Sequence, residues 1–202
     1  MLPLLLACAF ACVSFACTAS TTDPFIEAGE DLLETFDPDS DPEGGFASLN
    51  RFAAERPTLA ADTARGLVEA EEDNTRYAAV YVLGLTADAD DERQALRGAL
   101  DDRLSYLRAI AAGSLIGLGE AGAIPVLIDL LAITDEIPGS LPSTFVDRFA
   151  SDTLTAYTGE DFGVMEARGS KARAQAQARW REWFDSVRGS IRWDPATARY
   201  ET

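Results

Sequence analysis

The sequence of 202 residues contains no histidine and a single lysine, Lys171. Without histidine the chain cannot build a Ser-His-Asp triad or a histidine-liganded metal site. A serine–lysine pair would have to use Lys171, and the sequence has no glycine-rich phosphate-binding motif. The commonest catalytic arrangements are therefore excluded, and the sequence predicts a protein that is not an enzyme, has no metal site and needs no cofactor.

Basic residues are also scarce: 17 lysines and arginines face 34 aspartates and glutamates, and the net charge is −17. Nucleic acids and anionic membranes are bound through lysine and arginine, so this balance argues against both as partners. It favours solubility and a protein partner with a basic surface. The charge is uneven, because residues 21–45 contain nine acidic and no basic residues, whereas residues 166–202 carry a net charge of +3.

Cysteine occurs three times, always near the start, as Cys8, Cys12 and Cys17. The segment from residue 2 to 15 is apolar or small throughout, but it is shorter than the ~20 residues of a spanning helix. Such a run followed by small residues is typical of a secretory signal peptide, predicted here as residues 1–16. The usual positive start is missing, because no basic residue precedes Arg51. A short buried apolar segment is the alternative.

Cleavage before Cys17 would make this cysteine the first residue of the mature chain, which resembles a bacterial lipoprotein. The resemblance implies lipidation of Cys17, membrane contact only through that lipid, and a location outside the cytoplasm in the cell envelope. Ser14 departs from the pattern, since leucine is expected there. Simple secretion after Ala16 or Ala19 is the alternative. In both cases no disulfide can form in the mature chain, so packing must stabilise it.

Residues 17–45 are predicted to be an acidic tether with a short helix from about Pro24 to Thr35. Proline suits the first helical position, with Asp23 as its cap. Residues 37–45 then alternate carboxylates as calcium loops do. However, Pro42 and Ser48 stand where an EF-hand loop needs glycine and glutamate. A solvated linker is therefore preferred over a weak divalent-cation site.

From residue 46 onward the pattern is helical and repeats itself. The segment 77–85 has a counterpart 33 residues later at 110–118, and Arg76 and Arg108 are 32 residues apart. Each unit consists of a helix rich in small residues, a turn with glycine and an apolar second helix. A single hairpin of this kind cannot bury its own apolar face, so neighbouring hairpins must stack. The sequence predicts an all-α stack over residues 46–188; an irregular helical bundle is the alternative.

Several segments carry a family resemblance. Residues 73–79, with Asp73, Arg76 and Ala79, resemble the D-x-x-V-R-x-x-A opening of bacterial HEAT repeats, and residues 107–111 repeat its second part. Residues 119–128 resemble the following turn and second helix. Thr75 and Ser105 depart from the pattern. The resemblance implies a right-handed α-α superhelix, a short HEAT-like or armadillo-like stack with a concave groove lined by the second helices.

The C-terminal part resembles a terminal element of many bacterial HEAT-repeat proteins, through residues 157–163 and 179–184. Ser170 is predicted to cap a helix that runs through residue 187. Trp180, Trp183 and Phe184 fall on one face of this helix, which is predicted to close the last repeat as a lid. Residues 189–202 are predicted to be a tail that folds back over the stack or stays mobile.

These observations predict a non-catalytic protein-binding scaffold that is exported and lipid-anchored. The alternative is a small hydrolase, or a sugar- or cation-binding protein, that works through carboxylates. Acidic residues around the second helices are the candidates for contact with a basic partner: Asp91, Glu92, Asp101, Asp102 and Asp129. The alternative for these five is that they only keep the protein soluble.

Overall fold

The computed structural model describes residues 24–163 and 169–202. The predicted signal peptide and Cys17 lie outside the described residues, as does the first part of the tether. The described chain is built from α-helices and one two-stranded sheet, which confirms the predicted all-α class. No helix in these two ranges is long and apolar enough to span a membrane. In chain order the elements are α1 (Pro24–Glu34), α2 (Pro42–Glu55), α3 (Pro57–Leu67), α4 (Asp73–Thr86), α5 (Asp90–Ala99), α6 (Ser105–Gly117), the 3-10 helix η1 (Ala121–Ala123), α7 (Ile124–Leu130), α8 (Val146–Thr158), α9 (Ser170–Val187), β1 (Arg192–Asp194) and β2 (Arg199–Glu201).

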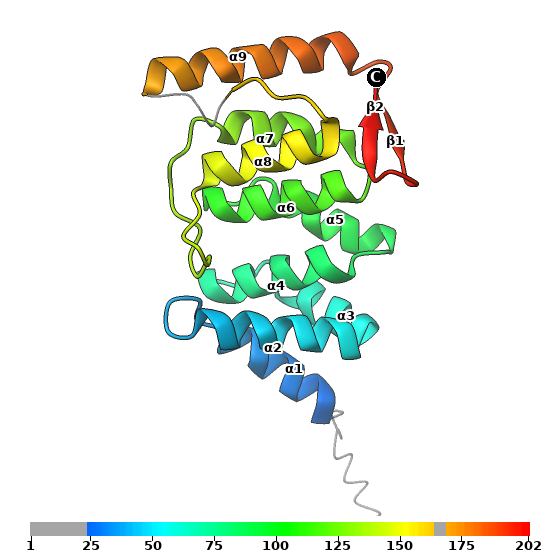
Figure 1. The fold of residues 1–202 in the computed structure, drawn as a ribbon. Helices are drawn as coiled ribbons and strands as arrows, with labels where there is room; N and C mark the ends of the chain where they lie inside the picture. The colour runs from blue at the N-terminus through cyan, green and yellow to red at the C-terminus, as the bar shows by residue number, and fades with distance from the viewer. Residues whose placement is uncertain (1–23, 164–168) are drawn as a thin grey trace, which may run out of the picture.

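The helices form two layers of successive hairpins (Figure 1). The first helices α2, α4, α6 and α8 pack side by side in one layer. Each of the second helices α3, α5 and α7 packs against the first helix of its own hairpin and against that of the next. Helix α1 covers the start of the stack, and α9 packs on α7 at the other end (Figure 1). The stacking predicted from the sequence repeat is therefore present.

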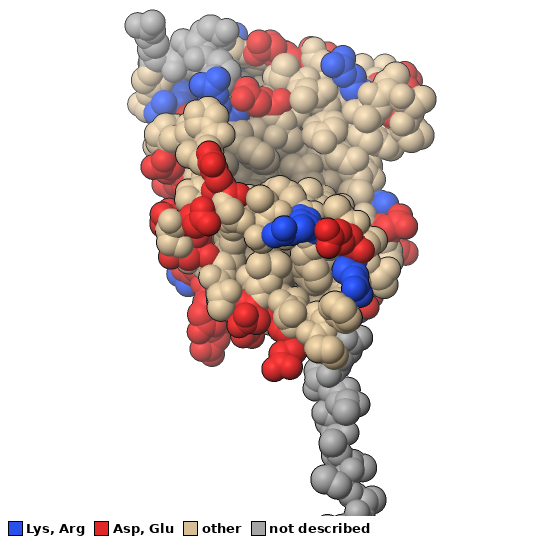
Figure 2. Space-filling model, turned by 60° about the horizontal axis from the view of Figure 1, so that its bottom comes forward, with Lys and Arg blue, Asp and Glu red and all other residues tan. Residues whose placement is uncertain are grey.

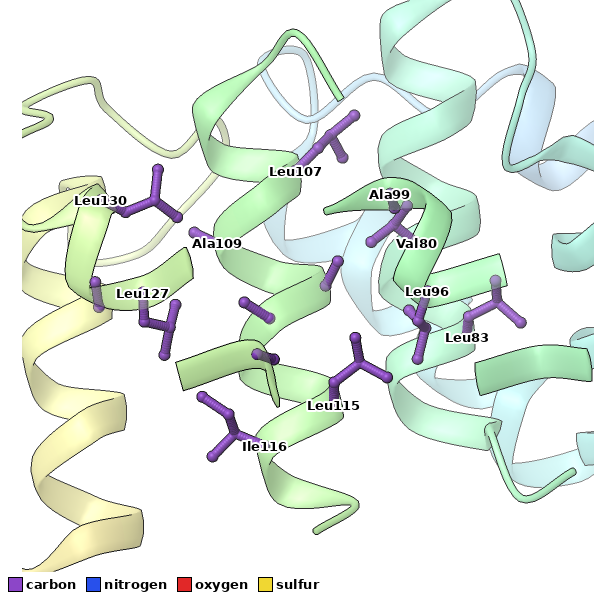
Figure 3. Packing of buried hydrophobic residues seen from close by; sticks show 14 of the residues in the cluster. Val80, Leu83, Leu96, Ala99, Leu107, Ala109, Leu115, Ile116, Leu127 and Leu130 are labelled. Atoms are coloured by element: carbon purple, nitrogen blue, oxygen red, sulfur yellow. The ribbon is translucent and has the colours of Figure 1, made fainter. Parts of the chain in front are cut away.

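Small and large apolar residues have different roles in the core. Ala78 and Ala79 of α4 and Ala111 and Ala112 of α6 are fully buried, which lets neighbouring helices approach closely. Larger aliphatic side chains from α4 to α7 fill the space between the two layers (Figure 3). Because first and second helices of several hairpins supply these side chains together, no single hairpin could form the core alone. The residues labelled in Figure 3 are Val80, Leu83, Leu96, Ala99, Leu107, Ala109, Leu115, Ile116, Leu127 and Leu130.

One polar contact recurs with the period of the sequence. Nη1 of Arg76 donates to the backbone carbonyls of Ala70 and Glu71, both at 2.9 Å. Nη1 of Arg108 donates to the carbonyls of Asp102 and Arg103, at 2.7 and 3.2 Å. In both cases the guanidinium binds the fifth and sixth residues before it. The two arginines therefore close equivalent turns before α4 and α6, and the sequence repeat is also a structural repeat.

The predicted linker is part of the fold. Helix α1 closely matches the predicted helix, but α2 begins at Pro42, so the predicted domain start at residue 46 lies inside α2. Phe36 is 5% exposed, and its ring packs edge-on against Phe46 and Tyr77, with centroids 5.2 and 5.7 Å away. Burial of Leu33 and Phe36 offsets the cost of ordering this acidic segment.

The carboxylates between α1 and α2 have local structural roles. Oδ1 of Asp37 accepts a hydrogen bond from the backbone N–H of Asp39 at 3.0 Å. Oδ1 of Asp41 accepts one from Gly44 at 3.1 Å and caps α2, whose first residue is Pro42. These bonds form a turn and a helix cap, which is how aspartate is commonly used before a helix.

Helix α9 has the predicted bounds and lies over the last hairpin. Its N-cap is Gly169 and no side chain caps it, so the prediction that Ser170 caps this helix was wrong. Trp180 is fully buried, with its ring edge-on to Phe162 at 4.8 Å and to Trp183 at 5.5 Å. Gln177 fastens the helix further, because its side-chain amide donates to two backbone carbonyls at the end of α7, at 2.8 and 3.1 Å.

The C-terminal tail folds back as a short hairpin, the first of the two predicted alternatives. Strands β1 and β2 pair antiparallel, with Trp193 opposite Tyr200 and their rings 5.0 Å apart. The Tyr200 hydroxyl donates to the carbonyl of Ile116 at 3.2 Å. Trp193 also packs on Gly119, which has a φ of +86° and no room for a side chain. The hairpin therefore clamps the C-terminal end of α6.

Candidate functional site

The predicted acidic contact residues lie around the second helices, but most are engaged within the protein. Asp91 forms an ion pair with Arg65 of α3. The carboxylate of Glu92 accepts hydrogen bonds from the backbone N–H groups of Asp88 and Ala89, at 2.7 and 3.0 Å. Asp91 thus joins two second helices, and Glu92 caps the helix that it belongs to.

The other three acidic residues differ from one another. Asp102 pairs with Arg76 at 2.8 Å, and its side chain is 13% exposed. Asp129 pairs with Arg181 of α9 at 2.7 Å, so it fastens the lid. Asp101 is exposed, and within the described ranges its side chain has no hydrogen bond or ion pair. The five residues thus do not share one role, and only Asp101 offers an unengaged carboxylate.

A polar hollow of about 550 Å³ separates α3 from α5 on the second-helix layer. Glu69 and Asp101 contribute carboxylates to it, and Arg65 and Arg76 contribute guanidinium groups. Gly98 leaves it wide, because a side chain there would meet nothing within 4 Å. Over residues 24–163 and 169–202 no group of three acidic or cysteine side chains is arranged to hold a metal ion.

The opposite layer carries a different feature, an apolar trough of about 570 Å³. It lies over the first helices α4, α6 and α8, and the loop of residues 131–145 between α7 and α8 closes one side. In Figure 1 this loop descends along the edge of the stack from α7 towards α2. None of the described residues that line it is charged: Phe46, Tyr77, Tyr81, Gly84, Leu85, Ile110, Gly113, Ser114, Ile137, Gly139, Ser140, Leu141, Thr144, Phe149, Thr153 and Tyr157.

Small residues form the floor of the trough. A Cβ atom added to Gly84 of α4 would lie 2.4 Å from the Oγ of Ser114 on α6. A Cβ added to Gly113 would lie 3.1 Å from the ring of Phe149 on α8. Glycine therefore permits the close approach of the three helices. The outer face of α6 then forms the floor of the trough between α4 and α8.

Aromatic rings form the walls of the trough, and the hydroxyls of Tyr77 and Tyr81 are already bonded. Tyr77 donates to the carbonyl of Pro138 at 3.1 Å, and Tyr81 donates to Oδ1 of Asn50 at 3.0 Å. Burial raises the pKa of Tyr77 well above its usual value. Because these hydroxyls hold protein groups, the trough presents mainly ring surface to a ligand. Its rim carries Leu85 and Leu141, which are 50% and 64% exposed.

The loop beside the trough is fixed by its own contacts. The backbone N–H of Ile137 donates to the carbonyl of Thr144 at 2.9 Å, and the Oγ of Ser140 accepts from the N–H of Thr144 at 2.8 Å. Gly139, with a φ of +68°, sits so close to Pro38 that a Cβ atom would lie 2.8 Å away. The trough is therefore formed in advance, which reduces the entropy lost when a ligand binds.

The lining of the trough consists of apolar, aromatic and hydroxyl-bearing side chains together with glycine. Sequence reasoning missed this site because it looked for charged residues on the second helices. The recurrence of glycine at residues 84 and 117 was a signal, since both positions touch a neighbouring first helix. The fold of the 131–145 loop had no comparable sequence signal.

Comparison of the sequence with models of known protein families gives no match, and comparison with curated proteins gives none either.

Proposed function

We propose that the protein is a non-catalytic scaffold of HEAT-like hairpins that binds another protein through the apolar trough. The observation that carries this proposal is a preformed, uncharged trough whose rim leaves Leu85 and Leu141 exposed to water. Contiguous exposed apolar surface is costly in a monomer and commonly marks an interaction site. The recurring turn contacts of Arg76 and Arg108 support the repeat architecture on which the proposal rests.

The shape of the trough favours a segment of a protein as its ligand. Its lining comes from α2, α4, α6, α8 and the 131–145 loop, so it extends across several successive hairpins. An amphipathic helix or an extended strand presents side chains at intervals along such a surface, and a groove between helices accepts them as anchors. Aromatic walls suit this role, because tyrosine and phenylalanine are enriched where proteins bind one another.

We also propose that the scaffold is exported and attached to the bacterial envelope through a lipid on Cys17. The apolar run of residues 2–15 and the cysteine after it support this proposal. Labelling cells with a radioactive fatty acid tests it, since label should enter the wild-type protein and not a Cys17→Ser variant. A wild-type protein that takes up no label and fractionates with soluble proteins would contradict lipid attachment.

Site-specific photo-crosslinking of the full chain tests the binding function. A photoreactive amino acid replaces Leu141 on the rim or Thr153 in the lining, and the same residue replaces Phe25 of α1, which is 52% exposed, as a control. Illumination of cells should give a discrete adduct with another protein from the two trough positions and not from position 25. Absence of an adduct at both trough positions would contradict the proposed docking site.

A further inference from the structure

We infer that the trough takes a segment of the partner that combines an apolar anchor with a cationic flank, the flank lying at the end formed by the 131–145 loop. This inference rests on the proposed function, because it specifies the ligand of the same site. It is carried by the distribution of charge around an uncharged lining.

Two exposed acidic residues flank the trough at its loop end without being part of its lining: Asp39 follows Pro38, which lies against Gly139, and Glu136 precedes Ile137. Asp39 lies close enough to the trough for its charge to act on Tyr77, where it adds to the effect of burial in raising the pKa of that phenol. Glu136 belongs to the loop itself and accepts a hydrogen bond from the hydroxyl of Ser143. Both acidic side chains are exposed, and within the described ranges neither forms an ion pair.

The α8 side of the rim is close to neutral. Arg148 lies beside Phe149, and its guanidinium is 3.7 Å from the carboxylate of Asp152, one helical turn further on. This pair cancels most of its own charge, whereas Asp39 and Glu136 at the loop end form no ion pair with any described residue. A basic flank placed there would gain attraction without displacing an internal ion pair.

The floor fixes where the apolar anchor would lie. Gly113 and Ser114 leave the outer face of α6 low between Tyr81 on one side and Phe149 on the other. An aliphatic or aromatic side chain entering there would be enclosed by rings and would meet no charged group. A cationic residue a short distance from that anchor would then reach the exposed carboxylates of Asp39 and Glu136.

Charge also argues against two other occupants. A second copy of this chain has a net charge of −17 and would place like charges opposite each other at the rim. An anionic lipid headgroup would face the same carboxylates. Acidic side chains are also widespread on the face shown in Figure 2, with basic ones scattered among them. A cationic segment, by contrast, would be attracted by these negative charges.

A random peptide library selected on the purified full chain tests the inference. We expect the enriched peptides to place lysine or arginine near leucine, isoleucine or an aromatic residue. Neutralising the loop end with Asp39→Asn and Glu136→Gln should weaken their binding about fivefold or more at low salt, and little at high salt. Leu141→Asn should weaken binding at both salt concentrations, because it removes apolar rim surface.

The matched control neutralises two carboxylates away from the trough, with Glu27→Gln and Glu30→Gln on α1, and should leave peptide binding unchanged. All these substitutions are at exposed positions, so unchanged thermal unfolding would show that each variant remains folded. Enrichment of acidic or uncharged peptides, equal loss in the control, or no enrichment would overturn the inference. The protein-binding function would still stand if trough crosslinks formed to a segment without basic residues, and it would fail if no crosslink formed.

Discussion

The guanidinium of Arg76 and the carboxylate of Asp102 join the second hairpin to the third, with Nε and Oδ2 2.8 Å apart. The two side chains are only 9% and 13% exposed. The same guanidinium binds Asp73 at 2.7 Å and the carbonyls of the preceding turn. The hydrogen bond to Asp102 is the main reason why the pKa of Arg76 is raised, although burial opposes it. This charge is well paired in a place with little water.

Removal of this arginine should be strongly destabilising. Arg76→Ala would leave the largely buried carboxylate of Asp102 without its cation, and we expect the free energy of unfolding to fall by about 3 kcal/mol. Urea unfolding followed by helical circular dichroism measures the change. The control is Arg148→Ala, whose ion pair with Asp152 is 60% and 61% exposed. Its effect should stay within about 0.5 kcal/mol, and equal losses in the two variants would contradict the structural role given to Arg76.

The repeat was predictable because the same physical demand occurs twice. Arg76 and Arg108 perform the same contact, and each is followed by small residues that must face a neighbouring helix, so composition and period coincide. The C-terminal helix with its aromatic face was predictable for a similar reason, since a side chain as large and apolar as that of Trp180 favours burial. In both cases a local pattern determines a local contact.

The trough and the acidic arm were not predictable in this way. Phe36 is buried only because Phe46 and Tyr77 converge on it from elsewhere in the chain. The loop beside the trough reaches back to Pro38, about a hundred residues earlier in the sequence. Carboxylates such as Asp102 looked like surface residues, because a single sequence does not show which acid meets which arginine. Long-range pairing decides these features, and local patterns do not encode it.

Replacement of two helical glycines by alanine should change the stability of the protein in opposite directions. Gly84→Ala would place a Cβ atom 2.4 Å from the Oγ of Ser114, so this hydroxyl must rotate out of its hydrogen bond to Ile110 or α4 and α6 must move apart, at a cost of about 1–3 kcal/mol. Gly98→Ala on α5 meets nothing within 4 Å and should stabilise the protein by up to about 1 kcal/mol, because alanine favours the helix. Thermal and urea unfolding of both variants check the signs.

A double variant identifies the cause of the loss at Gly84. Ser114→Ala removes the hydroxyl that the new methyl group would strike, and the remaining Cβ would lie at an ordinary 3.4 Å. We expect Gly84→Ala combined with Ser114→Ala to be more stable than the sum of the two single effects predicts. Strict additivity would show that the crowding lies elsewhere.

Much of what the lid helix α9 contributes to the stability of the protein should come from the indole of Trp180. Trp180 is fully buried against Phe162 and Trp183, and Trp180→Ala should cost about 3–5 kcal/mol through lost contacts and the cavity left behind. Trp183 is only partly buried, so Trp183→Ala should cost clearly less. Urea unfolding gives both values, and near-ultraviolet circular dichroism reports the packing of the rings. A larger loss from Trp183→Ala would contradict the arrangement.

Alkaline pH should unfold the protein through its buried phenols. Burial is the main reason why the pKa values of Tyr77 and Tyr200 are raised above the usual value. The folded state therefore keeps both protons at a pH where the unfolded chain has released them. The stability from these two groups is fully present below about pH 10, the pKa of tyrosine in an unfolded chain. It falls as the pH rises above that value towards the folded pKa, since the unfolded state then binds fewer protons.

The urea midpoint should thus decline steeply above about pH 10, and the phenolate absorbance of Tyr77 and Tyr200 should appear only together with loss of helix. Tyr200→Phe removes one titrating group and also the hydrogen bond to Ile116, so this variant should be less stable at neutral pH but less sensitive to alkali. Tyr77→Phe should behave alike, because its hydroxyl binds Pro138. Complete ionisation of all tyrosines while the helical signal persists would show that these two phenols are open to water. That result would contradict both the clamp that Tyr200 forms on α6 and the trough wall that Tyr77 forms.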